Sequence, residues 1–191
     1  IDLAGSLQIE DYYRTDLHWR QDRLLPAAKT LAQAMGASVE EAFETQTLAR
    51  DYYGLYYGYA ALPVKPETIS YLTSDTIESA VVTNFETNRT CAVYDMEKAA
   101  GKNPYEMFLS GSVSLLTIEN ANAKTDRELV IFRDSFASSL APLLLDGYAK
   151  ITLVDIRYLP SVRLGSFLTF SDQDVLFLYS VNVLNNSETI K

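Results

Sequence analysis

The clearest pattern of apolar positions lies in the C-terminal third of the chain. Short apolar runs at 129–132, 151–156 and 175–181 have the length and composition of strands buried on both faces. Between the first two runs, residues 136–146 carry leucines at helical spacing, and Gly147 follows as a stop. A strand, a helix and a strand joined by short connections predict a right-handed parallel βαβ unit.

The N-terminal two thirds show shorter patterns. A helix is predicted to start after Trp19 and to end at Gly36, because leucines and alanines recur at helical spacing between Leu24 and Met35. Four other segments have apolar positions typical of short elements: strands or hairpins at 71–84, 89–96 and 113–118, and a short helix at 104–109.

Residues 37–103 differ from the rest of the chain. Within them, Asp51-Tyr-Tyr-Gly-Leu-Tyr-Tyr-Gly-Tyr59 places five tyrosines in nine positions, and Pro63 and Pro66 break any regular element that follows. We interpret 37–103 as an excursion or lid-like insertion. The chain has 191 residues and shows neither linker nor repeat, so a single domain over 1–191 is predicted.

Composition narrows the choice of partners. With 16 Lys and Arg against 25 Asp and Glu, the net charge is −9, and no basic cluster is present that would bind nucleic acid. The single cysteine, Cys91, and the single histidine, His18, exclude an internal disulfide and any metal site built from several Cys or several His. No metal or other cofactor is expected, and the oligomeric state is left open.

Two further features concern the chain as a whole. No apolar run reaches about 18 residues, so no membrane-spanning segment is predicted. The sequence begins at Ile1 rather than at Met, which leads us to expect the C-terminal part of a longer protein.

Candidate chemistry centres on Ser135, which follows the strand predicted at 129–132 and starts a helix. Reactive groups in α/β enzymes lie at such strand ends, where the N–H groups of a helix terminus favour negative charge. His18 and Asp16 are two positions apart, so in an extended segment they would project to one face. A serine, an imidazole and a carboxylate are the components of a nucleophilic triad.

Each of these residues also has a purely structural interpretation. Ser135 or Asp134 could cap the helix that follows, and Asp16 could cap the helix predicted after Trp19. A lone histidine such as His18 is more often structural than catalytic. Local sequence leaves both interpretations open.

Several blocks of the sequence resemble the motifs of the bacterial DHHW family, and they follow the family's order along the chain. The blocks are Tyr12-Tyr-Arg-Thr-Asp-Leu-His-Trp19, Pro104-Tyr-Glu-Met-Phe-Leu-Ser-Gly111 with Thr117-Ile-Glu-Asn120, Leu129-Val-Ile-Phe-Arg-Asp-Ser-Phe-Ala137 with Val154-Asp-Ile-Arg-Tyr158, and Asp174-Val-Leu-Phe-Leu-Tyr179 with Asn182. This family in turn resembles the SGNH-hydrolase-like domains of periplasmic alginate O-acetyltransferases.

The resemblance implies a three-layer α/β/α SGNH-hydrolase-like domain with a mostly parallel central sheet. It also implies roles: Ser135 as the nucleophile, His18 as the base and Asp16 as the carboxylate that orients the histidine. Members of the family are generally exported, so an extracellular or cell-surface location is expected.

Two of the departures from the family pattern bear on the site; two others are Arg20 in place of the usual Thr and the missing Gly-Ala of the following helix. Leu17 stands where the family has its first histidine, and Ser110-Gly111-Ser112 stands where the family has Gly-Gly-Asn. The asparagine would have been the candidate oxyanion donor. Without it, the candidates are Gly111 and Ser112, with Asn182 as a third.

Other residues are candidates for binding substrate. Arg157 and Tyr158 follow the strand predicted at 151–156, at the sheet end where Ser135 is expected, although Arg157 could instead pair with Asp155. Tyr56 and Tyr57 could stack on sugar rings, or could simply pack the excursion.

The predicted function is that of an SGNH-like acyl-ester enzyme, an O-acyltransferase or esterase, acting on an extracellular or cell-envelope polysaccharide. The alternative is a catalytically inactive domain of the same fold that binds glycans or other surface partners. The substrate is expected to be a carbohydrate or an acyl ester in either case.

Overall fold

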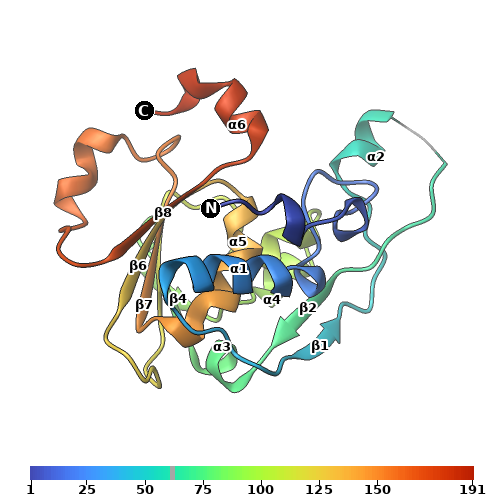
Figure 1. Cartoon of the computed structure of the whole chain (residues 1–191). Coiled ribbons are helices and arrows are strands. Elements are labelled where there is room, and N and C mark those ends of the chain that lie inside the picture. Colours follow the sequence, from blue (N-terminus) through green and yellow to red (C-terminus); the bar gives the residue numbers. More distant parts are fainter. Residues whose placement is uncertain (61–62) are drawn as a thin grey trace.

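A six-stranded sheet forms the centre of the computed structural model, which describes residues 1–60 and 63–191 (Figure 1). Helices accompany the sheet, so the predicted α/β class is confirmed. The strands lie in the order β4-β3-β5-β7-β6-β8. Their bounds are β3 Val81–Asn84, β4 Arg89–Cys91, β5 Leu115–Glu119, β6 Glu128–Arg133, β7 Lys150–Val154 and β8 Asp174–Leu178.

The sheet is mixed, and not mostly parallel as predicted. Strand β6 is parallel to both β7 and β8. The pairings β3–β4, β3–β5 and β5–β7 are antiparallel. A tight turn over 85–88 joins β3 to β4, and such a short connection permits only an antiparallel pair.

The βαβ unit predicted in the C-terminal third is present. Strand β6 leads into α5, Phe136–Leu140, and the chain returns as β7, parallel to β6 and hydrogen-bonded to it. The predicted helix 136–146 is divided, because the chain tightens into the 3₁₀ helix η5, Ala141–Gly147, near Pro142. Proline lacks the N–H that would continue the α-helical ladder.

The remaining elements surround this unit. Helix α1, Leu25–Met35, ends at Gly36 with φ of 64°, as predicted, but it starts later than predicted, after the 3₁₀ helix Gln21–Arg23, with Pro26 in its first turn. The segment 71–84 is not all strand, since Ser74 caps a short helix within it. The other elements are β1 Glu44–Thr47, α2 Leu55–Ala60, β2 Ser70–Thr73, α3 Asp75–Ser79, α4 Met96–Ala99, α6 Val181–Asn185 and the 3₁₀ helices η1 Ala4–Ser6, η2 Ile9–Asp11, η3 Gln21–Arg23, η4 Pro104–Met107, η6 Ser161–Ser166 and η7 Ser187–Thr189.

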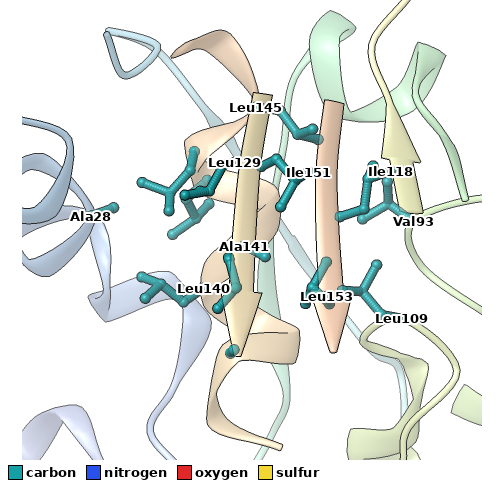
Figure 2. Close-up of a cluster of buried hydrophobic side chains, with 14 of the residues drawn as sticks. Ala28, Val93, Leu109, Ile118, Leu129, Leu140, Ala141, Leu145, Ile151 and Leu153 are labelled. Atoms are coloured by element: carbon teal, nitrogen blue, oxygen red, sulfur yellow. The ribbon is translucent and has the colours of Figure 1, made fainter. Parts of the chain in front are cut away.

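The two faces of the sheet are covered differently. On one face, α1, α3, α5 and η5 enclose the main core, where Leu129, Ile151 and Leu153 of the sheet meet Leu140 of α5 (Figure 2). On the other face a smaller cluster around Phe132 is covered by residues 156–168, which include η6. The sheet therefore lies between a helical layer and a thinner, irregular one.

Residues 37–103 divide between two places. Strands β3 and β4 extend the central sheet, while β1 and β2 form a separate antiparallel pair. In Figure 1, α2 lies on the side of the molecule away from β8 and α6. Among the described residues, no helix is long and apolar enough to cross a membrane.

Candidate active site

A row of three hydrogen-bonded side chains joins two distant parts of the sequence. The Ser135 hydroxyl oxygen lies 2.7 Å from Nε2 of His18, which is 117 positions away in the chain. On the other side of the ring, Nδ1 of His18 lies 2.5 Å from Oδ1 of Asp16. The structure thus brings together the three residues that were predicted as a catalytic set.

Ser135 owes its position to the end of β6 and the start of α5. The neighbouring carboxylate, Asp134, is 1% exposed and accepts hydrogen bonds from the N–H groups of Phe136, at 3.0 Å, and Ser180, at 2.7 Å. The Asp134 carboxylate therefore caps the first turn of α5 and links that turn to the segment after β8. Ser135 makes no side-chain capping bond, which leaves its hydroxyl for His18.

Asp16 is held by a turn and by a neighbouring loop. Its Oδ1 accepts the His18 backbone N–H at 3.0 Å, so the pair is fixed by an Asx-type turn and not by the extended segment that was predicted. Its Oδ2 accepts the Leu55 N–H at 2.9 Å. Burial raises the pKa of Asp16, but the hydrogen bonds from His18 and Leu55 outweigh it and bring the pKa down to about 2.

The His18 ring is fixed by aromatic packing. It stacks on Tyr105 with ring centroids 4.1 Å apart and also contacts Phe136 at 5.0 Å. The Tyr105 hydroxyl lies 2.9 Å from the Ser139 hydroxyl, and Nε1 of Trp19 donates to that same oxygen at 2.8 Å. Ser139 of α5 thus contacts both Tyr105, which stacks on His18, and Trp19, which follows His18 in the chain.

Two residues that sequence reasoning missed support the loop that carries Asp16. Glu67 accepts hydrogen bonds from the backbone N–H groups of Arg14, at 3.0 Å, and Thr15, at 2.9 Å. Gly54 donates its N–H to the Thr15 hydroxyl at 3.0 Å, and a Cβ at Gly54 would lie 2.4 Å from Cβ of Asp16. The only signal in the sequence was a glycine inside the tyrosine-rich segment.

A pocket of about 120 Å³ opens beside the Ser135 hydroxyl. Gly111 and Ser112, two of the three residues predicted as oxyanion donors, line it. They reach it because β5 is antiparallel to β7, so the segment before β5 lies at the edge where the parallel strands end. The full lining is His18, Asn103, Tyr105, Glu106, Phe108, Gly111, Ser112, Ser135 and Ser138.

The backbone that leads into β5 has an unusual conformation. Leu109, Ser110 and Gly111 have φ values of 54°, 59° and 82°. Left-handed backbone is costly for Leu109 and Ser110, and such strain concentrates at functional sites. The Gly111 N–H is already engaged, since it donates to the Phe108 carbonyl at 3.2 Å.

The remaining predicted site residues lie elsewhere. Asn182 is in α6 and lines a different pocket of about 360 Å³. Arg157 donates to both carboxylate oxygens of Asp155, at 2.9 and 2.6 Å, and its guanidinium lies over the Tyr158 ring. Arg157 therefore pairs with Asp155, the alternative given in the sequence analysis. Neither Arg157 nor Tyr158 lines the Ser135 pocket.

The tyrosine-rich segment is mostly exposed. Tyr56 and Tyr57 of α2 are 47% and 38% exposed, and Tyr53 packs against Tyr57 with ring centroids 4.5 Å apart. Tyr52 is the exception, because it is buried beside the Asp16 loop. The segment is thus a surface feature anchored at the back of the site.

Three lining residues were not among the predicted site residues: Asn103, Glu106 and Ser138, of which only Glu106 lies within a quoted motif. Asn103 and Glu106 face each other at the rim, with Nδ2 and Oε1 3.5 Å apart. Over the two described ranges, 1–60 and 63–191, no three His, Cys, Asp or Glu side chains gather in a group that could hold a metal ion.

Comparison with solved structures identifies the class of protein to which this geometry is similar. A DHHW family protein from Eubacterium siraeum is 27% identical with a TM-score of 0.68, and the match covers 94% of this chain and 63% of that protein. The resemblance to the DHHW family that the motifs predicted is confirmed. The chain spans less than two thirds of that relative's length.

Two structures of Bacillus cereus PatB1, one of them with a sulfonyl adduct, share the fold. They are 20% and 19% identical with TM-scores of 0.66 and 0.67, and each match covers 92% of this chain and 62% or 64% of PatB1. The O-acetyltransferase domain of Pseudomonas putida AlgJ is a more distant match, 13% identical with a TM-score of 0.41, covering 88% of this chain and 52% of that one. No protein-family model and no curated protein matches the sequence.

Proposed function

We propose that the chain is an SGNH-hydrolase-like acyl-ester enzyme, an O-acyltransferase or esterase, in which Ser135, His18 and Asp16 form the catalytic triad. The observation that carries the proposal is the row of hydrogen bonds at 2.7 and 2.5 Å. A nucleophile, its base and the group that orients the base need contacts of this length. The burial of Asp16, at 6% exposure, supports its role as a fixed anion.

The reaction would proceed in two halves. The Ser135 oxygen attacks the acyl carbonyl carbon while its proton passes to Nε2 of His18. The tetrahedral intermediate then collapses, the bond to the leaving alcohol breaks, and His18 returns the proton to that alcohol. In the second half, water or a sugar hydroxyl gives its proton to His18, attacks the acyl-serine, and Ser135 regains its proton as the acyl group leaves.

Labelling with phenylmethylsulfonyl fluoride tests the proposal. An activated serine displaces fluoride and gains the sulfonyl group, so intact mass and peptide mapping should place one adduct on Ser135. The Ser135→Ala variant should gain none, and both proteins should be compared with His18→Gln, which should label far more slowly. A folded wild-type chain that does not label would overturn the proposal.

The stability of the Ser135→Ala variant distinguishes catalysis from helix capping. Since Ser135 makes no capping bond, we expect its loss to change the free energy of unfolding by less than about 0.5 kcal/mol. A capping serine would cost about 1 kcal/mol. Urea unfolding followed by far-ultraviolet circular dichroism measures the difference.

The substrate we propose is an acyl ester on a polysaccharide outside the cell. Two features support a carbohydrate: the exposed tyrosines of the 51–59 segment, whose faces suit sugar rings, and the anchoring of that segment to Asp16 through the Leu55 N–H. An extracellular or cell-surface location follows from the DHHW resemblance and stands as part of the proposal.

One observation favours a second candidate, a glycan-binding domain without catalysis. The asparagine expected in the middle motif is replaced by Ser112, which is exposed. Under this alternative, phenylmethylsulfonyl fluoride would leave Ser135 unmodified, and polysaccharide binding measured by calorimetry would fall in a Tyr56→Ser, Tyr57→Ser double variant. Both results are needed to prefer it.

A further inference from the structure

A fully buried arginine lies next to the proposed nucleophile. Arg133, the last residue of β6, is 0% exposed. Its guanidinium donates to the Val113 carbonyl at 2.8 Å and to the Ser138 hydroxyl oxygen at 2.9 Å, and its Nε has no hydrogen-bond partner. Within the described part of the chain it forms no direct ion pair, although the charges of Asp155, Asp134 and Glu86 act on it from farther away, and Asp155 is paired with Arg157.

A buried charge of this kind is costly. Removing a guanidinium from water is unfavourable unless a direct ion pair or full hydrogen bonding compensates, and Arg133 has neither. An oxyanion that forms during a reaction near Arg133 would supply the missing negative charge and so stabilise the transition state. Arg133 does not itself line the pocket beside Ser135, but its guanidinium donates to Ser138, which does.

Ser138 connects that charge to the pocket. It lies three positions after Ser135 on α5, so the two side chains share one face of the helix, and both line the same pocket. The Ser138 oxygen accepts from Arg133, which orients the hydroxyl and leaves its proton to be donated. Across the two described ranges, the hydrogen bond from Arg133 is the one that the Ser138 hydroxyl makes.

The predicted oxyanion donors leave this role open. The Gly111 N–H already donates to Phe108, and Asn182 lines another pocket. Ser112 is exposed, whereas Ser138 is 1% exposed, and a donor shielded from water stabilises charge more strongly.

We infer that Ser138 is a further catalytic residue, whose hydroxyl, polarised by Arg133, donates a hydrogen bond to the oxyanion of the tetrahedral intermediate. The inference rests on the proposed acyl-ester function. Ser138 would then supply the contact for which the family pattern has an asparagine near position 112, from a different element of the fold. Arg133 acts through Ser138 and is a positioning residue.

Hydrolysis of p-nitrophenyl acetate tests the inference. The Ser138→Ala variant should lower kcat by about 100-fold or more while KM stays within about threefold, because the contact exists only in the transition state. The matched control is Thr152→Val, which removes another buried hydroxyl, 4% exposed in β7, away from the pocket. Its kcat should stay within about twofold of wild type.

The outcomes separate the two proposals. If the wild-type chain neither hydrolyses the ester nor gains a sulfonyl group, the proposed function itself fails. If wild type is active and a folded Ser138→Ala variant keeps its kcat, only the role of Ser138 fails. Thermal unfolding by circular dichroism, with activity measured below the transition, shows that the variant is folded.

A structure of the wild-type chain with Ser135 sulfonylated tests the same contact without a substitution. A sulfonyl oxygen within about 3 Å of the Ser138 hydroxyl oxygen supports the assignment. The assignment is overturned if both sulfonyl oxygens lie beyond hydrogen-bonding distance of Ser138, even in the event that Ser138→Ala does not fold.

Discussion

At the residue scale, the site depends on which partner each short polar side chain takes. Ser135 and Asp134 are both candidates to cap α5, and in the structure the backbone N–H of Phe136 donates to the Asp134 carboxylate. The Ser135 hydroxyl therefore stays free for His18. Asp16 in turn accepts three hydrogen bonds from His18 and Leu55, which keep it ionised.

Replacing Asp16 should affect activity and acid stability together. The Asp16→Asn variant should lower kcat for p-nitrophenyl acetate by roughly three to four orders of magnitude, since an amide cannot stabilise the imidazolium that forms. The pKa of Asp16 falls from 3.8 to about 2 on folding, so its ionised form stabilises the folded state above pH 3.8. That contribution, about 2 kcal/mol, is lost as the pH drops from about 4 through 2.

Urea unfolding between pH 2 and pH 5 checks the second part. The difference in free energy of unfolding between wild type and Asp16→Asn should narrow as the pH falls, with Asp51→Asn, an exposed carboxylate, as the control. A difference that stays constant over this range would show that Asp16 does not titrate with a lowered pKa.

At the element scale, the tyrosine-rich segment and α2 are fastened to the loop that carries Asp16. Three backbone N–H groups make the attachment: Gly54 donates to the Thr15 hydroxyl, Leu55 to Asp16, and Tyr56 to the Thr15 carbonyl at 2.8 Å. The close approach requires glycine at 54, because a Cβ there would lie 2.4 Å from the Thr15 carbonyl oxygen.

Two glycines of this segment provide a matched pair of variants. Gly54→Ala should destabilise the protein by about 1–3 kcal/mol and slow sulfonylation of Ser135, because the added methyl group pushes α2 away from Asp16. Gly58→Ala should be neutral or stabilising by up to about 1 kcal/mol, since a Cβ at this helical position meets nothing within 4 Å. Thermal unfolding and labelling rates of both variants test this, and equal effects would contradict it.

At the scale of the whole molecule, polar side chains join the β1–β2 pair to the helical layer and to the segment after β4. Gln21, which is 0% exposed, accepts the Leu72 N–H of β2 at 2.9 Å and donates to the Ser139 carbonyl at 2.8 Å. The Tyr94 hydroxyl also donates to the Leu72 carbonyl. These links support the proposal that 1–191 is one domain.

One cooperative unfolding transition is the expected consequence. The fluorescence of Trp19, the single tryptophan, reports on the site, while far-ultraviolet circular dichroism reports on all elements. Urea unfolding curves from the two probes should coincide in midpoint and slope. A separate earlier transition in circular dichroism would mean that part of the 37–103 segment unfolds on its own.

The sequence by itself determined the elements whose burial follows a local period. Apolar runs placed β6 and β7, leucine spacing placed α1 and the helix after β6, and glycines marked their ends. It also placed Ser135 at a strand end and Asp16 beside His18, because motifs and strand ends are local features. The DHHW resemblance then linked these residues before any contact between them was known.

Only the tertiary structure decided which of these residues meet. The contact between Ser135 and His18 spans 117 positions, and the antiparallel entry of β5 is what carries Gly111 and Ser112 to the pocket. Long-range pairing of this kind depends on how whole elements pack, which no local period encodes. The roles inferred for Arg133 and Ser138 also depend on the tertiary structure, because both side chains are buried only once the chain is folded.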